Sequence, residues 1–404
     1  MKYILADKNL VVAGRCFEGF PLLIGPDGRR MEPAQDFLWD VIASNGRIES
    51  KRSWDVYGRA MYDYFAFVMT NGLDWKAPAQ DGIPTALEAW RDWSLATAGL
   101  SKSTINHRLR TIHRFYQWAV RKKHLAELPF EYNEVQTLRT DPGFLAHVDR
   151  RGGRVASPQF MLKQPKEEIR FLSKEQLEVG LADLRERNLT HALMFELMAR
   201  TGLRQIEMRT FPDAYVFDPS RRKDLDPARK IRVAISPRDM EIKWSKPREI
   251  DVPYDLMERL WEYSLRHRQR RANNRADGQE FPHLFLTEQG KPYTKQAVGD
   301  IFRKLAHRVG FEITAHMLRH SYATYLLWSL RKSKTFEGEP LLYVRDRMGH
   351  SDVSTTTVYL HLINRLEGSL VLAHEDEIDA IFTAKRGPTQ GTHSDTPEPQ
   401  GVRA

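Results

Sequence analysis

Cysteine is almost absent from this sequence, which has 404 residues and a single cysteine, Cys16. One cysteine cannot form a disulfide within the chain, so a disulfide-stabilised secreted domain is excluded and a reducing compartment is expected. A lone cysteine near the N-terminus is also a poor candidate for a catalytic nucleophile. We therefore interpret Cys16 as buried or incidental to function.

Long apolar runs are also missing, since no stretch approaches the roughly 20 residues of a membrane-spanning helix. The first residues, Met1 to Lys8, reach charged side chains too early for a secretory signal peptide. We therefore expect a cytoplasmic protein without membrane contact. Neither a P-loop nor a carboxylate cluster suited to Mg²⁺ is present, so we expect no cofactor and no metal.

Basic residues outnumber acidic ones, with 62 Lys and Arg against 53 Asp and Glu and a formal net charge of +9. This excess favours a polyanion such as nucleic acid as the partner, although a basic enzyme without such a partner is the alternative. Hydrophobic residues make up 41% of the chain, as in a globular protein with an ordinary core. The length predicts two or three domains.

The N-terminal third divides into two predicted parts. Residues 1–50 combine short apolar stretches with strong turn signals, which predicts an N-terminal extension of short strands and turns with no assigned role. Helical periodicity follows over residues 51–138. We expect three helices there, the first capped by Ser53, the second from Thr85 to Thr97, and the third capped at Ser101 or Ser103.

The third of these helices pairs an apolar stripe, which runs from Ile105 to Ala119, with a basic face. The basic face carries Lys102, His107, Arg108, Arg110 and Arg114. This arrangement suits a helix that lies on phosphates, so residues 51–138 are predicted to form a DNA-binding domain. The alternative is an ordinary solvated helix face.

Two segments lack periodicity. Residues 139–170 are rich in Arg and Lys and are interrupted by Pro and Gly, which predicts a basic linker that could wrap a duplex or act as a plain spacer. Residues 385–404 are rich in Pro, Thr, Ser and Gly, and we expect a disordered tail.

Residues 171–384 form the other predicted domain. Its first helix follows a capping-box pattern from Ser173 to Gln176. Two period-two stretches, residues 231–235 and 250–252, predict strands of a small antiparallel sheet. The remainder has helical periodicity, so the expected fold class is mainly α with a small antiparallel β-sheet (α+β) in this domain.

The second domain carries the residue types that DNA cleavage needs. Breaking a phosphodiester without metal or nucleotide requires a nucleophile, fixed donors for the non-bridging oxygens and a proton donor for the leaving 5′-oxygen. Arginine suits the second task because its planar fork donates two bonds and stays charged, and lysine or histidine suits the third. In chain order the candidates are Arg204, Lys243, His316, Arg319, His350 and Tyr359.

These stretches resemble the tyrosine recombinase (phage integrase) family. The family pattern is T-G-L-R-x-x-E, a hairpin lysine in K-x-x-K-x-R, H-x-L-R-H, G-H and a tyrosine nine residues later. Every element occurs here in order, over about 155 residues from Arg204 to Tyr359. Each element is weak evidence alone. The chain has 14 tyrosines, and a lone tyrosine is usually a core residue. A lone H-x-x-R is usually a surface pair. Their joint order and spacing would seldom arise by chance.

The resemblance implies a two-domain DNA clamp and a reaction independent of metal and ATP. Tyr359 would attack the scissile phosphate and form a 3′-phosphotyrosine. Arg204 and Arg319 would hold the non-bridging oxygens, and Lys243 would protonate the leaving 5′-oxygen.

Four more residues receive roles from the resemblance. His316 would help to take the tyrosine proton, and His350 would hydrogen-bond the phosphate. Glu207 would orient the first arginine, and His320 would support the site from behind. For Glu207 and His320, simple helix packing is the alternative.

The implied function is site-specific recombination or integration for a mobile element, with double-stranded DNA as partner, at the nucleoid in the bacterial cytoplasm. Family members commonly act as tetramers on DNA and pass a C-terminal helix to a neighbour. The amphipathic stretch 375–382 would be that helix, with Ile378, Ile381 and Phe382 as anchors. The alternative is docking on its own domain.

Three departures from the family pattern stand out. Trp244 follows the hairpin lysine where the family usually has a small residue, and Met317 replaces a frequent polar residue. Residues 331–338 indicate an inserted loop. Alternatives to a recombinase are a type IB topoisomerase or telomere resolvase, which share the chemistry, and a DNA-binding protein that has lost catalysis.

Overall fold

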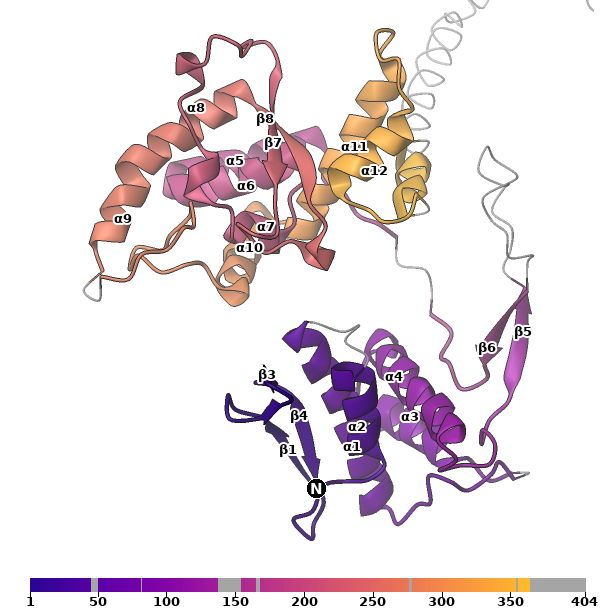
Figure 1. Ribbon diagram of the computed structural model, residues 1–404. Helices are drawn as coiled ribbons and strands as arrows, with labels where there is room; N and C mark the ends of the chain where they lie inside the picture. The colour runs from indigo at the N-terminus through magenta and orange to yellow at the C-terminus, as the bar shows by residue number, and fades with distance from the viewer. Residues whose placement is uncertain are drawn as a thin grey trace, which may run out of the picture. The chain divides into compact units, whose positions relative to one another are not determined.

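The computed structural model describes residues 1–44, 50–80, 82–136, 154–164, 168–275, 278–353 and 355–363. Its contacts divide the chain into two units, Met1–Glu167 and Glu168–Ala404. Both consist mainly of helices with two-stranded antiparallel sheets, which confirms the predicted fold class (Figure 1). Within the described ranges, no helix is both long and apolar enough to cross a membrane.

The first unit opens with strands and continues with helices. Strand β1 pairs with β4, and β2 pairs with β3. The elements are β1 (Lys2–Leu5), β2 (Val11–Val12), β3 (Arg15–Cys16), β4 (Pro21–Ile24), α1 (Ala34–Leu38), α2 (Lys51–Thr70), α3 (Ala86–Ala96) and α4 (Lys102–Arg121). A hairpin of β5 (Tyr132–Gln136) and β6 (Arg154–Pro158) follows.

The N-terminal strands share one core with the helices that follow them. Phe20 and Leu23 are fully buried in the same apolar cluster as the inner faces of α2 and α4. The Phe20 ring lies edge-on to Trp39 and Trp54, with centroid distances of 5.3 and 6.2 Å. Strands β1 and β4 lie beside α2 (Figure 1). The N-terminal extension therefore forms part of the first unit's core.

One predicted cap of this unit is confirmed and one is wrong. The Ser101 hydroxyl accepts the backbone N–H of Thr104 at 3.2 Å, and Thr85, the predicted start of the second helix, forms a capping box with Glu88. Helix α2 has Ser50 at its N-cap, so Ser53 lies inside its first turn.

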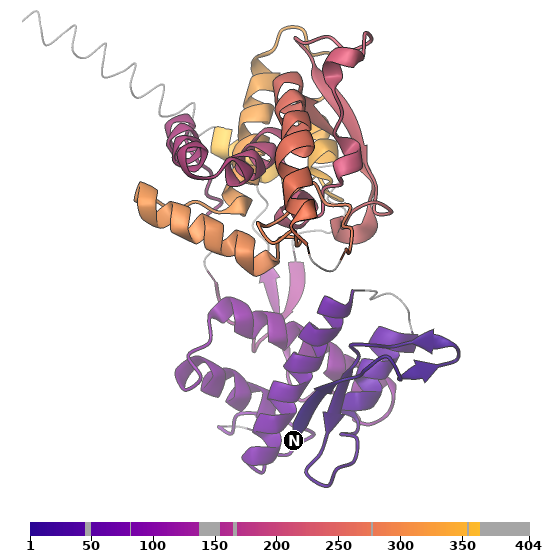
Figure 2. The same ribbon diagram turned by 90° about the vertical axis from the view of Figure 1, so that its left-hand side faces the viewer.

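Cys16 is exposed, so the first of its two predicted alternatives, burial, is wrong. It lies on the short β2–β3 hairpin, whose four strand residues are all exposed. The hairpin stands at the edge of the first unit (indigo in Figure 2). A strand pair this short has no second layer to cover it, so its side chains remain in water.

Part of the predicted linker packs onto the first unit. Strand β6 pairs with β5, and Phe160 is 1% exposed in the core of this unit. The Asn106 side chain on α4 donates to the Leu162 carbonyl at 2.8 Å and accepts its N–H at 3.0 Å. The apolar side chains after β6 explain this packing, because burying them removes them from water. Residues 139–153 of the predicted linker lie outside the described residues.

In the second unit, strand β8 of one hairpin packs against helices (Figure 1). Its elements are α5 (Lys174–Arg187), α6 (Leu189–Thr201), α7 (Gln205–Arg209), β7 (Lys230–Ile235), β8 (Arg248–Pro253), α8 (Tyr254–Tyr263), α9 (Gln269–Asn273), α10 (Lys295–Val309), α11 (Ala315–Lys332) and α12 (Pro340–Met348). The capping box of Ser173 and Gln176 at the start of α5 is confirmed.

The predicted strand pair is confirmed as β7 and β8, which pair antiparallel with Val233 opposite Ile250. Their connection includes a 3₁₀ turn over Lys243–Ser245. Helix α11 extends to Lys332, so Arg331 and Lys332 are helical and not part of an inserted loop. The predicted helix at 375–382 and the tail at 385–404 lie outside the described residues.

The shared core makes a testable prediction about Phe20. Phe20→Ala should lower the free energy of unfolding of the first unit by about 3–5 kcal/mol, because it removes a fully buried ring from the cluster. Urea unfolding followed by tryptophan fluorescence measures this change. The control is Ile4→Ala, whose side chain is 46% exposed, and its effect should stay within about 0.5 kcal/mol. Equal, small effects of both substitutions would show that the strands do not share the core.

Candidate active site

The first candidate arginine is placed by a helix end. Helix α6 ends at Thr201, and Gly202 follows with a left-handed φ of +69°. A Cβ atom on Gly202 would lie 2.4 Å from a ring carbon of Tyr322, so both backbone and packing require glycine here. The turn makes Arg204 the N-cap residue of α7, as the motif predicted.

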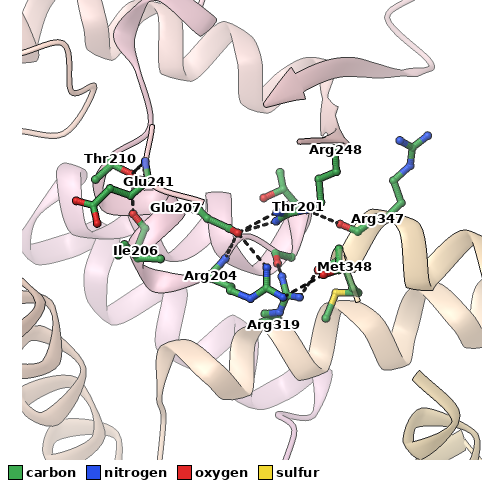
Figure 3. A network of polar contacts seen from close by, with 12 residues as sticks. Thr201, Arg204, Ile206, Glu207, Thr210, Glu241, Arg248, Arg319, Arg347 and Met348 are labelled. Atoms are coloured by element: carbon green, nitrogen blue, oxygen red, sulfur yellow. Dashed lines mark hydrogen bonds and ion pairs between the residues drawn. The ribbon is translucent and has the colours of Figure 1, made fainter. Parts of the chain in front are cut away.

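The Glu207 carboxylate is the centre of the site and is fully buried (Figure 3). Arg204 Nη1 donates to its Oε1 at 3.0 Å. Arg248, on β8, donates to both carboxylate oxygens, at 2.9 and 2.6 Å. Burial opposes the charge, but the hydrogen bonds and charge of Arg248 outweigh it and lower the pKa of Glu207 to about 2. The carboxylate is therefore ionised at neutral pH.

The same arginines also hold the end of α12. Arg248 Nε donates to the Arg347 carbonyl at 3.1 Å, and Arg204 Nη2 donates to the Gly349 carbonyl at 3.4 Å. Arg319 Nη2 donates to the Met348 carbonyl between them. Carbonyls at a helix C-terminus lack partners within the helix and carry partial negative charge, so they attract guanidinium groups.

Arg319, from α11, is the most deeply buried cation of this group, with 2% exposure. Its Nη1 donates to the Gly202 carbonyl, and its Nη2 lies 3.4 Å from His350 Nε2. Burial, followed by repulsion from Arg204, lowers the pKa of Arg319 to about 9. The group still carries its charge at neutral pH.

The Tyr359 hydroxyl reaches this cluster. Tyr359 lies in the helical stretch 355–363 and is 2% exposed. Its hydroxyl shares a hydrogen bond of 2.9 Å with His320 Nδ1, and its ring lies parallel to that of His350 at a centroid distance of 6.3 Å. Burial raises the pKa of Tyr359 to about 12, although Arg319 and Arg204 act in the opposite direction.

The two histidines beside the tyrosine are neutral at neutral pH. Burial and then the neighbouring His316 and Arg319 lower the pKa of His320 to about 3. Burial and then Arg319 lower the pKa of His350 to about 3. A neutral imidazole keeps one unprotonated nitrogen, so each histidine can accept a hydrogen bond. For His350, Arg319 approaches Nε2, and Nδ1 contacts the Thr356 hydroxyl at 3.0 Å.

His316 and Lys243 stand further from the hydroxyl. The His316 ring lies edge-on to His320, with a centroid distance of 4.2 Å. Burial lowers the pKa of His316, and the charges of Arg319 and Lys243 lower it further. Lys243 is exposed on the β7–β8 connection, with Nζ over the Trp244 ring at 5.5 Å. The second unit thus brings the predicted residues together, but His320 rather than His316 contacts Tyr359.

The predicted DNA-contacting residues of α4 differ in their surroundings. Lys102, His107 and Arg110 are exposed. Arg108 forms an ion pair of 2.7 Å with Asp63 on α2, and Arg114 donates to the Tyr57 hydroxyl.

Sequence reasoning missed Arg248 as part of the site. The available signal was the last residue of K-x-x-K-x-R, but a motif position does not reveal that its guanidinium grips Glu207. Among the residues that the structure describes, no three His, Cys, Asp or Glu side chains are grouped to hold a metal ion.

Comparison with known sequences follows this geometry. The Phage integrase family matches residues 170–365. Transposase A from transposon Tn554 of Staphylococcus aureus is 28% identical over 236 residues, which cover 55% of this chain and 57% of the transposase. Tyrosine recombinase XerC of Bacillus subtilis is 25% identical over 280 residues, which cover 68% of this chain and 76% of XerC. The chain therefore spans little more than half the length of the transposase.

Solved structures show the same fold. The XerH site-specific recombinase bound to a palindromic difH substrate superimposes with a TM-score of 0.52 and 18% identity, covering 83% of this chain and 84% of XerH. The Tn1549 transposon integrase in complex with transposon right end DNA gives a TM-score of 0.51 and 17% identity, covering 83% of this chain and 98% of the integrase. Residues 170–365 of this chain thus match the Phage integrase family, and the chain has the fold of these solved recombinase and integrase structures.

The shifted histidines predict how stability depends on pH. Between about pH 6.5 and 3 the unfolded chain binds protons at His320 and His350 that the folded chain does not, so stability falls as the pH falls through this range. Glu207, whose pKa drops from 4.5 unfolded to about 2 folded, adds a loss only below pH 4.5. Between pH 4.5 and 6.5, the change in the free energy of unfolding therefore comes from the histidines and not from Glu207.

His320→Asn should make the slope of unfolding free energy against pH shallower in that window, measured by urea unfolding at several pH values. His191, whose pKa burial lowers to about 4, is present in both proteins and cancels in the comparison. His107→Asn, on the exposed face of α4, controls for the loss of an imidazole. Parallel slopes for His320→Asn and wild type would contradict the assignment.

Proposed function

We propose that this chain is a site-specific DNA recombinase that cuts and rejoins strands through a phosphotyrosyl bond at Tyr359 and serves a mobile element. The observation that carries the proposal is the position of the Tyr359 hydroxyl. It lies 2.9 Å from His320 Nδ1, and the charges of Arg319 and Arg204 act to lower its pKa. A phenol that only filled the core would not need this basic surrounding.

The proposed cleavage is an exchange of one phosphoester for another. The Tyr359 oxygen bonds to phosphorus as the bond to the 5′-oxygen breaks, leaving a 3′-phosphotyrosine and a 5′-hydroxyl. The tyrosine proton passes to His320 Nδ1, and the Lys243 ammonium supplies a proton to the leaving oxygen. A 5′-hydroxyl then reverses the step and rejoins a strand. The phosphoester energy is kept in the phosphotyrosine, so rejoining needs no ATP.

The arginines would bind the non-bridging oxygens. The 3.4 Å contact from Arg204 to the Gly349 carbonyl is long, so a phosphate oxygen can replace it with a charge-assisted bond. Arg319 is held rigidly by two carbonyls and would meet the growing charge without rearrangement. Arg248 stays on Glu207 and acts as a positioning residue.

The three histidines of the site would have different roles. We assign the direct proton acceptor to His320 because it touches the hydroxyl, and His316 supports its ring from the adjacent helical turn. His350 lies beside Arg319 and would hydrogen-bond the phosphate. An anionic phosphate nearby raises the pKa of an imidazole, which favours the proton transfer that the free protein resists.

The relatives support the biological setting. Tn554 transposase and Tn1549 integrase belong to transposons, and the XerH structure is a complex with a palindromic difH substrate. We extend to this chain binding of double-stranded DNA by a two-domain clamp, with contacts from α4 through Lys102, His107 and Arg110. Assembly as a tetramer through residues 375–382, in the bacterial cytoplasm at the nucleoid, belongs to the same proposal.

Covalent capture tests the function. Cells expressing the protein are lysed in SDS, DNA that remains attached to the protein is recovered, and its junctions are sequenced. Wild type should yield adducts concentrated at one sequence, Tyr359→Phe should yield none, and Tyr254→Phe, outside the site, should match wild type. Adducts scattered over arbitrary sequences would indicate a topoisomerase. Absence of adducts from wild type would indicate a DNA-binding protein without catalysis.

The role of Lys243 is tested with sulfur chemistry on the captured sequence. Lys243→Ala should slow cleavage about 10²–10⁴-fold when the leaving atom is oxygen, because its proton donor is lost. A 5′-bridging sulfur leaves as a thiolate without that proton, so it should restore most of the rate. Lys246→Ala, on the same connection, should cleave the oxygen substrate at close to the wild-type rate. If sulfur leaves the Lys243→Ala defect unchanged, this lysine is not the acid.

A further inference from the structure

The connection between β7 and β8 exposes a tryptophan that no packing explains. The Trp244 side chain is 79% exposed, more than any other large apolar side chain in the described ranges. Its backbone has a φ of +68°, and Ser245 follows at +49°, so two successive residues other than glycine adopt the left-handed region. Such strain costs free energy and is retained mainly where a binding site needs it.

This tryptophan lies close in sequence to an active-site residue. Lys243 precedes it, and the charge of that lysine helps to lower the pKa of His316. Arg248, four residues after Trp244, donates to Glu207 at 2.9 and 2.6 Å. Four residues span at most about 14 Å, so the indole stays near the arginine cluster that would hold the scissile phosphate.

The two faces of the indole differ. The Lys243 ammonium lies over one face, 5.5 Å from the ring centroid, in a cation–π contact. The high exposure of the ring leaves the other face to water. An aromatic face with a cation behind it matches a nucleobase, which stacks on the open face while the cation meets the backbone phosphate.

We propose that Trp244 stacks on a base of the step beside the scissile phosphate and thereby brings Lys243 to the leaving oxygen. This inference rests on the proposed function and adds a specificity determinant to it. An apolar ring enters DNA most easily where a step unstacks at low cost, as pyrimidine–purine steps do. Trp244 should therefore favour cut sites that carry such a step.

Binding measurements separate stacking from charge. In a Tyr359→Phe background, Trp244→Ala should weaken binding to the captured duplex about tenfold, and Trp244→Phe should retain most of the affinity. The slope of log affinity against log salt should fall by no more than about one, for the single Lys243 contact that the indole positions. Lys246→Ala is the matched control, and it should reduce that slope by about one without the loss of affinity at high salt that Trp244→Ala shows. Wild-type affinity for Trp244→Ala, or a loss of affinity that disappears at high salt, would overturn the proposal.

Photocrosslinking locates the base. The Tyr359→Phe protein is irradiated on captured duplexes that carry 5-iodouracil at successive positions around the cut. Peptide mapping should find the crosslink at Trp244 only within one step of the scissile phosphate. Crosslinks confined to other residues would overturn the proposal. Because its side chain is exposed, Trp244→Ala should unfold at the wild-type temperature, so misfolding cannot mimic the result.

The two proposals fail in different ways. If the recombinase function fails, wild type forms no covalent adduct. If only the stacking fails, wild type and Trp244→Ala form adducts at the same rate and at the same sequences.

Discussion

The buried carboxylate of Glu207 is the constraint on which the rest of the site depends. A carboxylate without water must be neutralised by partners, and removing one partner of a buried ion pair costs roughly 3–5 kcal/mol. Arg204 and Arg248 supply that neutralisation from different elements, and both also bind carbonyls at the end of α12. One ion cluster thus fixes the start of α7, strand β8 and the helix that leads to His350.

The cluster holds more positive charge than its carboxylate can balance. Arg204, Arg248 and Arg319 surround a single Glu207, and helix-end carbonyls satisfy the remaining donors (Figure 3). Carbonyl dipoles hold the guanidinium groups in place without cancelling their charge. The site is therefore ready for an anion before one arrives, which is the electrostatic condition that phosphoryl transfer requires. The low pKa values of His320 and His350 follow from the same excess of charge and from burial.

Features set by local chemistry were predictable from the sequence. The helix start at Thr85, the caps at Ser101 and Ser173, and the strand pair around residues 231–235 and 250–252 depend on side chains within a few positions of one another. Features set by packing were not. The exposure of Cys16, the attachment of β6 to the first unit and the length of α11 depend on which apolar surfaces meet.

The order of the candidate residues, and with it the resemblance to the family, was determined by the sequence alone, because that pattern is read along the chain. Which histidine meets Tyr359 was decided only by the tertiary structure. His316 and His320 lie one helical turn apart on α11, and local geometry treats them alike. The helical stretch that carries Tyr359 packs against His320, and the partner of Arg248 lies 41 residues away. Contacts at such separations arise from the way helices pack, which no spacing within a motif encodes.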